Sequence, residues 1–250
     1  MRATAVLQRC LASALQPMHA LRSRTLLLAV ESLLAGRRAV LIDLARSWRG
    51  AERIRAPLKR LDRLLSNRRL HAERERLYGG MVRWLVRHPD PVIVVDWCRL
   101  KPDGRWHLLR AAVPVGGRTL TLFERVYPER ELASPIAEHD FLKRLKSLLP
   151  EGSCPILITD AGFRAPWCRS VDALGWHWIT RVRHRTHLKP VEVVDAPDQW
   201  VACRALYAVA QRTARDLGLF DLVRSRSIQA RLVLHARPPR GRHHVTLKGR

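Results

Sequence analysis

The chain has 250 residues, 47% of them hydrophobic, which is enough to bury the core of one large domain or two smaller ones. It contains 46 Lys and Arg against 22 Asp and Glu, a formal net charge of +24. Because self-repulsion of this charge opposes folding, the imbalance indicates a polyanionic partner, and the predominance of Arg favours nucleic acid over a membrane surface. A GC-rich genome would explain the Arg to Lys ratio but not the net charge.

The cysteines and the apolar runs exclude several other classes of protein. Five scattered cysteines without a CxxC pair indicate neither a zinc ribbon nor a disulfide framework, and they fit a reducing cytosol. The apolar run at residues 10–15 weakly imitates a targeting segment, but no small-residue cleavage pattern follows it. The run at residues 26–30 is far too short to span a bilayer, so we expect a cytoplasmic protein.

Residues 1–90 are predicted to be helical, because apolar residues recur there at helical spacing in several stretches. Asn67 is placed to cap a helix that starts after it, and Gly79-Gly80 is the weak point of that helix. The polar faces are strongly basic, with Arg63 and Arg68 among the candidate DNA contacts. Since an ordinary solvated face would mix both signs of charge, we interpret this segment as a helical DNA-binding region.

After residue 90 the pattern predicts an α/β fold, a mixed sheet with helices packed on it. Two short apolar runs have the character of buried strands, and two longer runs joined by Gly116-Gly117 indicate a hairpin. Ser134 is placed to cap the first of two further helices. The expected elements, in chain order, are strands at residues 91–96, 106–115 and 118–126, a helix at 134–149, a strand at 155–160, a helix at 166–174 and a strand at 176–182.

Residues 91–185 are therefore predicted to form the first part of a catalytic core, and residues 186–250 a basic, β-rich insertion that is incomplete. Within that insertion, residues 191–200 are expected to form a loop and a short strand. Apolar residues alternate at 227–236, which predicts another strand.

The apolar runs at residues 91–96 and 155–160 each end in an aspartate, Asp96 and Asp160. A carboxylate at the end of a buried strand is costly unless it is paired, and the hard cations Mg²⁺ and Mn²⁺ prefer carboxylate oxygens. Two such ions clamp the attacking and leaving oxygens of an in-line phosphoryl displacement. Alternatively each aspartate belongs to a turn, and the Ala-Gly-Phe sequence after Asp160 keeps that interpretation open.

Three arginines downstream are candidate DNA contacts. Arg164 follows Asp160 by four residues and either contacts a phosphate or lies on a surface turn. Arg181 and Arg183 are two residues apart on one predicted strand, so they project to the same side and can line a groove. Glu124 is expected to form a cross-strand ion pair rather than to support the metal, and Trp97 is expected to pack in the core.

Several spaced motifs occur in a fixed order along most of the chain. They are Leu61 to Asn67, Val95-Asp96-Trp97, Arg118 to Pro128, Thr159-Asp160-Ala-Gly-Phe-Arg164, Leu174-Gly-Trp176 and Arg181-Val-Arg183. The set resembles the insertion-sequence-four family of DDE transposases. The resemblance implies an RNase H-like fold and Mg²⁺-dependent (or Mn²⁺-dependent) cleavage and transfer of DNA strands at transposon ends. It matches Asp96 and Asp160 to the first and second catalytic aspartates.

The resemblance also implies a double-stranded DNA partner, a bacterial, nucleoid-associated location and a homodimer, or pairing with an intact transposase. The family's third carboxylate is a Glu in a later Tyr-Arg-Glu-Lys type motif, but no Glu follows Glu192 here. We therefore expect a C-terminally truncated chain that is inactive or nearly so. Two alternatives stay open: a DNA-binding or dimerising regulator of transposition, and an RNase H-like nuclease that recruits another acid, such as Asp172, as its third ligand.

Overall fold

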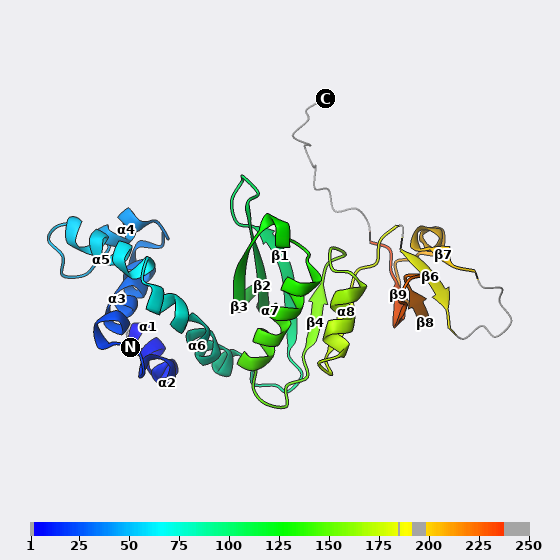
Figure 1. Cartoon of the computed structure of the whole chain (residues 1–250), viewed down its shortest axis with the longest axis horizontal. Coiled ribbons are helices and arrows are strands. Elements are labelled where there is room, and N and C mark those ends of the chain that lie inside the picture. Colours follow the sequence, from blue (N-terminus) through cyan, green and yellow to red (C-terminus); the bar gives the residue numbers. More distant parts are fainter. Residues whose placement is uncertain (1–2, 185, 192–198, 238–250) are drawn as a thin grey trace, which may run out of the picture.

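A computed structural model describes residues 3–184, 186–191 and 199–237 of the chain. It is a mixed α/β structure, elongated in Figure 1, with a group of helices at one end, a five-stranded sheet in the middle and a smaller four-stranded sheet at the other end. Within the described part of the chain, none of the helices is both long and apolar enough to cross a membrane.

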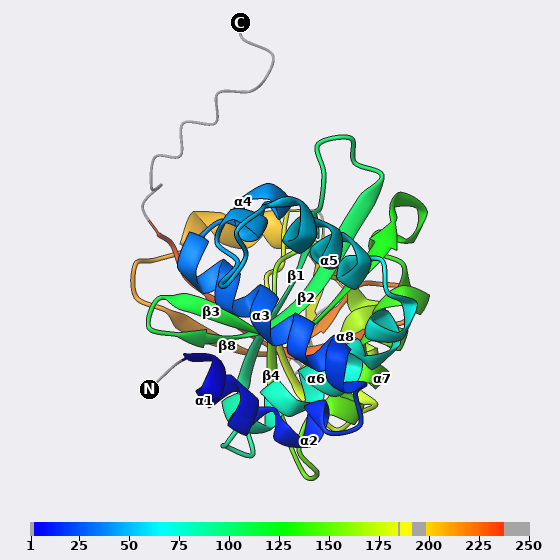
Figure 2. The same cartoon turned by 90° about the vertical axis from the view of Figure 1, so that its left-hand side faces the viewer.

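Six helices precede the first strand. They are α1 (Ala3–Cys10), α2 (Ala12–Leu15), α3 (Ala20–Gly36), α4 (Leu41–Arg46), α5 (Arg55–Leu65) and α6 (Arg68–Leu85). Ala45, Trp48 and Leu61 are buried together and form a small core of their own between α3, α4 and α5. Figure 2 looks from this end of the molecule, with the helices in front of the sheet.

Helix α6 connects the helical group to the sheet. Asn67 caps it as predicted, since its Oδ1 accepts hydrogen bonds from the backbone N–H groups of Arg69 (3.0 Å) and Leu70 (3.1 Å). The expected weak point does not break α6, which runs on to Leu85. Close packing explains the glycine at position 80, because a Cβ there would lie only 3.0 Å from Leu11 Cδ2.

The central sheet has the strand order β3-β2-β1-β4-β5. Its strands are β1 (Val92–Arg99), β2 (Trp106–Val115), β3 (Arg118–Pro128), β4 (Ile156–Thr159) and β5 (His177–Thr180). Strands β1, β2 and β3 pair antiparallel, whereas β4 runs parallel to both β1 and β5. The Gly116-Gly117 hairpin is confirmed, and both glycines adopt positive φ (53° and 77°), which suits a tight hairpin turn.

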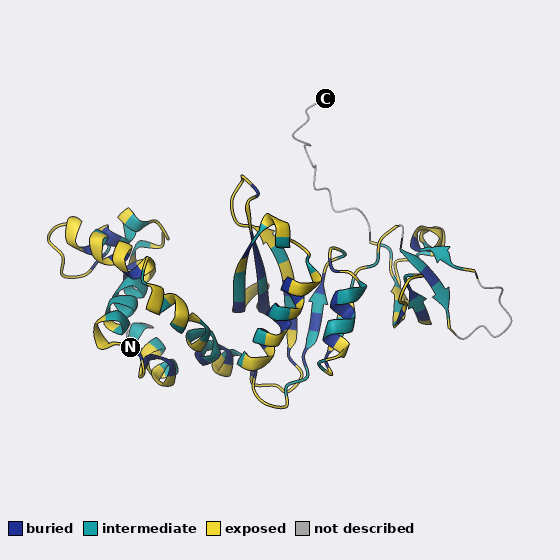
Figure 3. Ribbon diagram, in the orientation of Figure 1, coloured by how far each residue is buried: buried dark blue, intermediate teal, exposed yellow. Residues whose placement is uncertain are grey.

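Helices α7 (Pro135–Leu148) and α8 (Ala165–Asp172) lie side by side on one face of this sheet (Figure 1). A short 3₁₀ helix, η1 (Glu129–Glu131), precedes them. Ser134 stands immediately before α7, but its side chain makes no capping hydrogen bond, so that detail of the prediction is wrong. Figure 3 shows the buried residues concentrated between the helices and the sheet, where Phe123, Phe141 and Leu157 are fully buried.

The opposite face of the sheet carries side chains that remain accessible. Val92 and Ile179 are 38% and 57% exposed, and the register of β1, β4 and β5 puts both on the face away from α7 and α8. This is the face on which Asp96 lies, because it follows Val92 by an even number of residues.

The second sheet has the order β7-β6-β8-β9 and is antiparallel throughout. Its strands are β6 (His187–Pro190), β7 (Val201–Ala202), β8 (Arg215–Leu222) and β9 (Ile228–Leu234), with the 3₁₀ helix η2 (Cys203–Val209) after β7. The alternation predicted for residues 227–236 is confirmed, since the even-numbered residues of β9 are the more buried ones. Residues 192–198 and 238–250 of the predicted insertion lie outside the described residues.

Candidate metal and nucleic-acid site

The two predicted aspartates lie on neighbouring parallel strands. Val94 on β1 pairs with Ile158 on β4, and two further residues along each strand bring Asp96 beside Asp160. Both side chains are exposed. The structure therefore brings together the pair of carboxylates that the sequence singles out, on the accessible face of the sheet.

Asp96 differs from the prediction in one respect. It does not end its strand, because β1 continues through Arg99, whereas Asp160 directly follows the last residue of β4. Partial burial raises the pKa of the Asp96 carboxyl, and the negative charge of Asp160 raises it further, while a hydrogen bond from the Trp97 backbone opposes both effects. A carboxylate with a like charge beside it favours a cation between the two.

Asp160 belongs to a turn, which is one of the two interpretations that the sequence left open. Its Oδ1 accepts a hydrogen bond from the Gly162 N–H (2.7 Å), and its backbone carbonyl accepts one from Thr180 Oγ1 (2.9 Å), so the aspartate does organise a turn. Its Oδ2 faces Arg183, whose Nη2 is 3.5 Å away. Since an ionised carboxylate has about four acceptor sites, the turn still leaves Asp160 free to bind a cation.

A row of alternating charges crosses the sheet from Asp96. Arg110 on β2 is opposite Asp96, and Glu124 on β3 is opposite Arg110, so the three side chains share one face. Arg110 Nε donates to Glu124 Oε2 at 2.9 Å, which confirms the cross-strand ion pair expected for Glu124. Arg110 thus neutralises Glu124, which is engaged as its partner rather than as a support for the aspartates.

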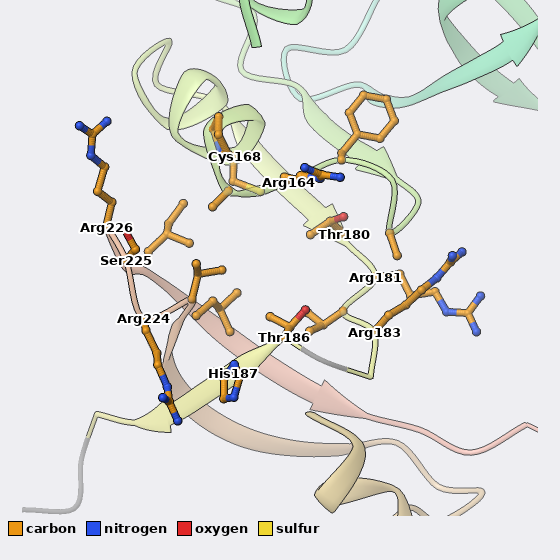
Figure 4. A pocket seen from close by; sticks show the side chains of 18 of the residues that line it. Arg164, Cys168, Thr180, Arg181, Arg183, Thr186, His187, Arg224, Ser225 and Arg226 are labelled. Atoms are coloured by element: carbon orange, nitrogen blue, oxygen red, sulfur yellow. The ribbon is translucent and has the colours of Figure 1, made fainter. Parts of the chain in front are cut away.

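An arginine-lined groove lies next to Asp160, between the central sheet and the second sheet (Figure 4). Its volume is about 1360 Å³. Arg181 and Arg183 do not lie on a strand as predicted, because β5 ends at Thr180, but their side chains extend toward the same side in Figure 4. Both line the groove, as does Arg164. None of the described residues that line the groove is acidic. The basic ones are Arg164, Arg169, Arg181, Arg183, His184, His187, Arg204, Arg224 and Arg226.

The second wall of the groove comes from the turn between β8 and β9, which sequence reasoning did not assign to the site. Arg224 and Arg226 belong to this turn, and Arg169 Nη1 donates a hydrogen bond to the Arg226 carbonyl oxygen (2.7 Å). Arg226 has a φ of 54°, a conformation that costs a non-glycine residue free energy and needs outside support. The hydrogen bond from Arg169 supplies that support and joins the turn to α8.

Other predicted residues stay apart from this site. Arg63 and Arg68 are exposed near the junction of α5 and α6. In Figure 1 the helices α4 and α5 lie at the opposite end of the molecule from β8 and β9, whose connecting turn lines the groove. Asp172 lies at the C-terminal end of α8 and accepts a hydrogen bond from Trp178 Nε1 (2.8 Å). It therefore does not join the aspartate pair. Among the described residues, His, Cys, Asp and Glu side chains form no group of three or more suited to a metal.

Sequence reasoning also missed Glu138, which is buried beneath the site with 4% of its surface exposed. Its Oε1 accepts a hydrogen bond from Trp97 Nε1 (3.2 Å), and burial raises the pKa of its carboxyl, against the lowering effects of that bond and of Arg164. A signal was present, because Glu138 precedes the buried Phe141 and Leu142 by three and four residues on the apolar stripe of α7.

Asp96 and Asp160 are the residues of this site that can hold a divalent cation, because both offer carboxylate oxygens to the same accessible space. The groove beside them offers guanidinium groups, which pair well with the phosphate oxygens of a polyanion. The chain matches no protein-family model, and the searches of curated proteins and of solved structures found no significant match.

Proposed function

We propose that the chain is the DNA-handling part of a DDE transposase and contributes the first two carboxylates, Asp96 and Asp160, of its metal site. The observation that carries the proposal is their position side by side at the edge of an arginine-lined groove. Mg²⁺ or Mn²⁺ bound there would activate and position the oxygens of a phosphodiester. The groove arginines would hold the same strand by its phosphates.

The fold is compatible with this function. A mixed sheet of order β3-β2-β1-β4-β5, with helices after β3 and after β4, fits the RNase H-like fold that the family resemblance implies. Asp96 stands on the central strand β1, and Asp160 directly follows the neighbouring strand β4. The insertion would follow β5 as the second sheet, which supplies the other wall of the groove.

We propose double-stranded DNA as the partner, contacted at two places. The groove provides one contact, and the basic faces around Arg63 and Arg68 provide the other at the far end of the molecule. Two basic surfaces at opposite ends of the molecule fit a long duplex better than a small phosphorylated ligand, because a small ligand would engage only one of them.

By itself the chain is proposed to bind DNA without cutting it. Among the described residues, two carboxylates come together at this site, one fewer than the three of the family's metal site, whereas the groove already carries many cationic groups. A regulator that occupies transposon ends, or that pairs with an intact transposase, is therefore the second candidate function. Mg²⁺-dependent cleavage of a duplex by the purified chain would contradict this part of the proposal.

Filter binding of a short DNA duplex at several salt concentrations tests the proposed DNA contact. The logarithm of the affinity should fall steeply and linearly with the logarithm of the salt concentration, because bound phosphates release counterions. Replacing Arg181 and Arg183 with Gln should reduce that slope by about 2, since each phosphate that an arginine neutralises adds roughly 0.9 to it. Arg130→Gln is the matched control, since Arg130 is exposed outside the groove. A flat salt dependence would overturn the proposal.

A further inference from the structure

Glu138 occupies an unusual place for a carboxylate. It lies in the first turn of α7, where the positive end of the helix dipole favours a negative charge, yet it faces the interior of the protein. A buried carboxylate is costly, and a well-packed apolar residue is often at least as stabilising. The burial of Glu138 therefore calls for a reason other than stability of the fold.

The neighbours of Glu138 are the residues that flank the aspartate pair. Trp97, which donates its Nε1 hydrogen bond to Glu138, directly follows Asp96 on β1. Arg164, whose charge acts on Glu138, follows Asp160 at the start of α8. One side chain on α7 thus touches the segment that carries Asp96 and electrostatically engages the segment that carries Asp160.

The Trp97 ring is held from a second side. It packs edge-on against Tyr127 on β3, with ring centroids 5.3 Å apart, and the Tyr127 hydroxyl donates to the Ala137 carbonyl (3.3 Å). Since successive residues of a strand project to opposite faces, fixing the Trp97 ring behind the sheet also fixes how β1 presents Asp96 in front of it. A shift of β1 relative to β4 would change the separation of the two carboxylates.

We propose that Glu138 is a positioning residue, which holds Asp96 and Asp160 at the spacing that a divalent cation requires. This inference rests on the proposed metal-binding function of the pair. Glu138 does not contact the cation, because its side chain lies on the other side of the sheet, and it acts through Trp97 and Arg164.

Mn²⁺ titration tests the inference, with free Mn²⁺ measured by electron paramagnetic resonance and stability measured by thermal unfolding. Glu138→Leu should weaken Mn²⁺ binding by about tenfold, the lower end of the effect of outer-shell groups on metal affinity, in protein that thermal unfolding shows to be folded at the titration temperature. Glu138→Gln keeps an acceptor for Trp97, so its affinity should stay much closer to wild type. A carboxylate with only a structural role would change stability and leave Mn²⁺ affinity unchanged.

Asp140→Asn is the matched control on the same helix, because Asp140 is ion-paired with Arg125 and Arg144 and has no bond to Trp97. It should leave Mn²⁺ affinity unchanged. If Glu138→Leu fails to fold, Trp97→Phe removes the donor of the same hydrogen bond and should weaken Mn²⁺ binding in the same way. If both Glu138→Leu and Trp97→Phe bind Mn²⁺ with wild-type affinity, the positioning role of Glu138 is wrong but the proposed metal site stands. If the wild-type chain binds no Mn²⁺, the proposed metal site is wrong as well.

Discussion

Arg183 Nη2 lies 3.5 Å from Asp160 Oδ2, so a single arginine of the groove also contacts the carboxylate pair. Both side chains are about half exposed, and an ion pair in such a position contributes little to stability, roughly 0–1 kcal/mol. Arg183 can therefore leave Asp160 for another partner with little loss of stability. A cation at Asp160 would release Arg183, which could then turn to a phosphate in the groove.

Arg183→Gln is predicted to change two binding reactions in opposite directions. It should strengthen Mn²⁺ binding severalfold, because it removes a competing positive charge from Asp160, and weaken DNA binding, because it removes a cation that pairs with a phosphate. Calorimetry with Mn²⁺ and filter binding with a DNA duplex measure the two effects. Arg181→Gln is the control that should weaken DNA binding with a smaller effect on Mn²⁺. A parallel loss of both affinities in Arg183→Gln would contradict the exchange.

Asp96→Asn is predicted to stabilise the protein at neutral pH. Burial and the charge of Asp160 raise the pKa of Asp96, so the folded state binds its proton more tightly than the unfolded state does. The charged form therefore opposes folding above the folded-state pKa, and this penalty disappears as the pH falls below the unfolded value of 3.8. Thermal unfolding should show a higher melting temperature for Asp96→Asn than for wild type at pH 7, with a smaller difference at pH 4.

Asp216 provides the comparison of opposite sign. A side-chain hydrogen bond from Arg231, together with one from the Gly218 backbone, lowers the pKa of its carboxyl. Its stabilising contribution is therefore present above the unfolded pKa and is lost as the pH falls, so Asp216→Asn should lower stability at pH 7. A stability loss in Asp96→Asn of the same sign as in Asp216→Asn would contradict the assigned cause of the Asp96 shift.

Gly162→Ala is predicted to disturb the second carboxylate specifically. A Cβ at this position would lie 2.8 Å from Asp160 Oδ1, too close for an unchanged side chain, so the carboxylate must move. We expect Mn²⁺ binding to weaken by roughly tenfold, the scale of effects seen when a ligand loses its orientation. The same substitution in an Asp160→Asn background should have no further effect, and an additive loss there would mean that Gly162 acts elsewhere.

The sequence predicted that Asp96 and Asp160 lie on neighbouring strands, because apolar strands follow from local pattern, but it wrongly ended the first strand at Asp96, since β1 continues through Arg99. The mixed sheet, the Gly116-Gly117 hairpin and the Asn67 cap also depend on short-range chemistry and were predicted for that reason. The second wall of the groove was not predicted, because the approach of Arg224 and Arg226 to α8 depends on long-range packing of the second sheet. Glu138 was missed because periodicity marks a buried face without saying what a polar residue on it contacts.

Diffraction from crystals grown with Mn²⁺ tests the central claim most directly, because anomalous scattering locates the ion without relying on activity. The pairing of β1 with β4 predicts an anomalous peak between the carboxylates of Asp96 and Asp160, within about 2.0–2.6 Å of oxygen atoms from both. Asp96→Asn should remove or greatly weaken that peak. A peak elsewhere, or an empty site at saturating Mn²⁺, would contradict the metal-binding role of the pair.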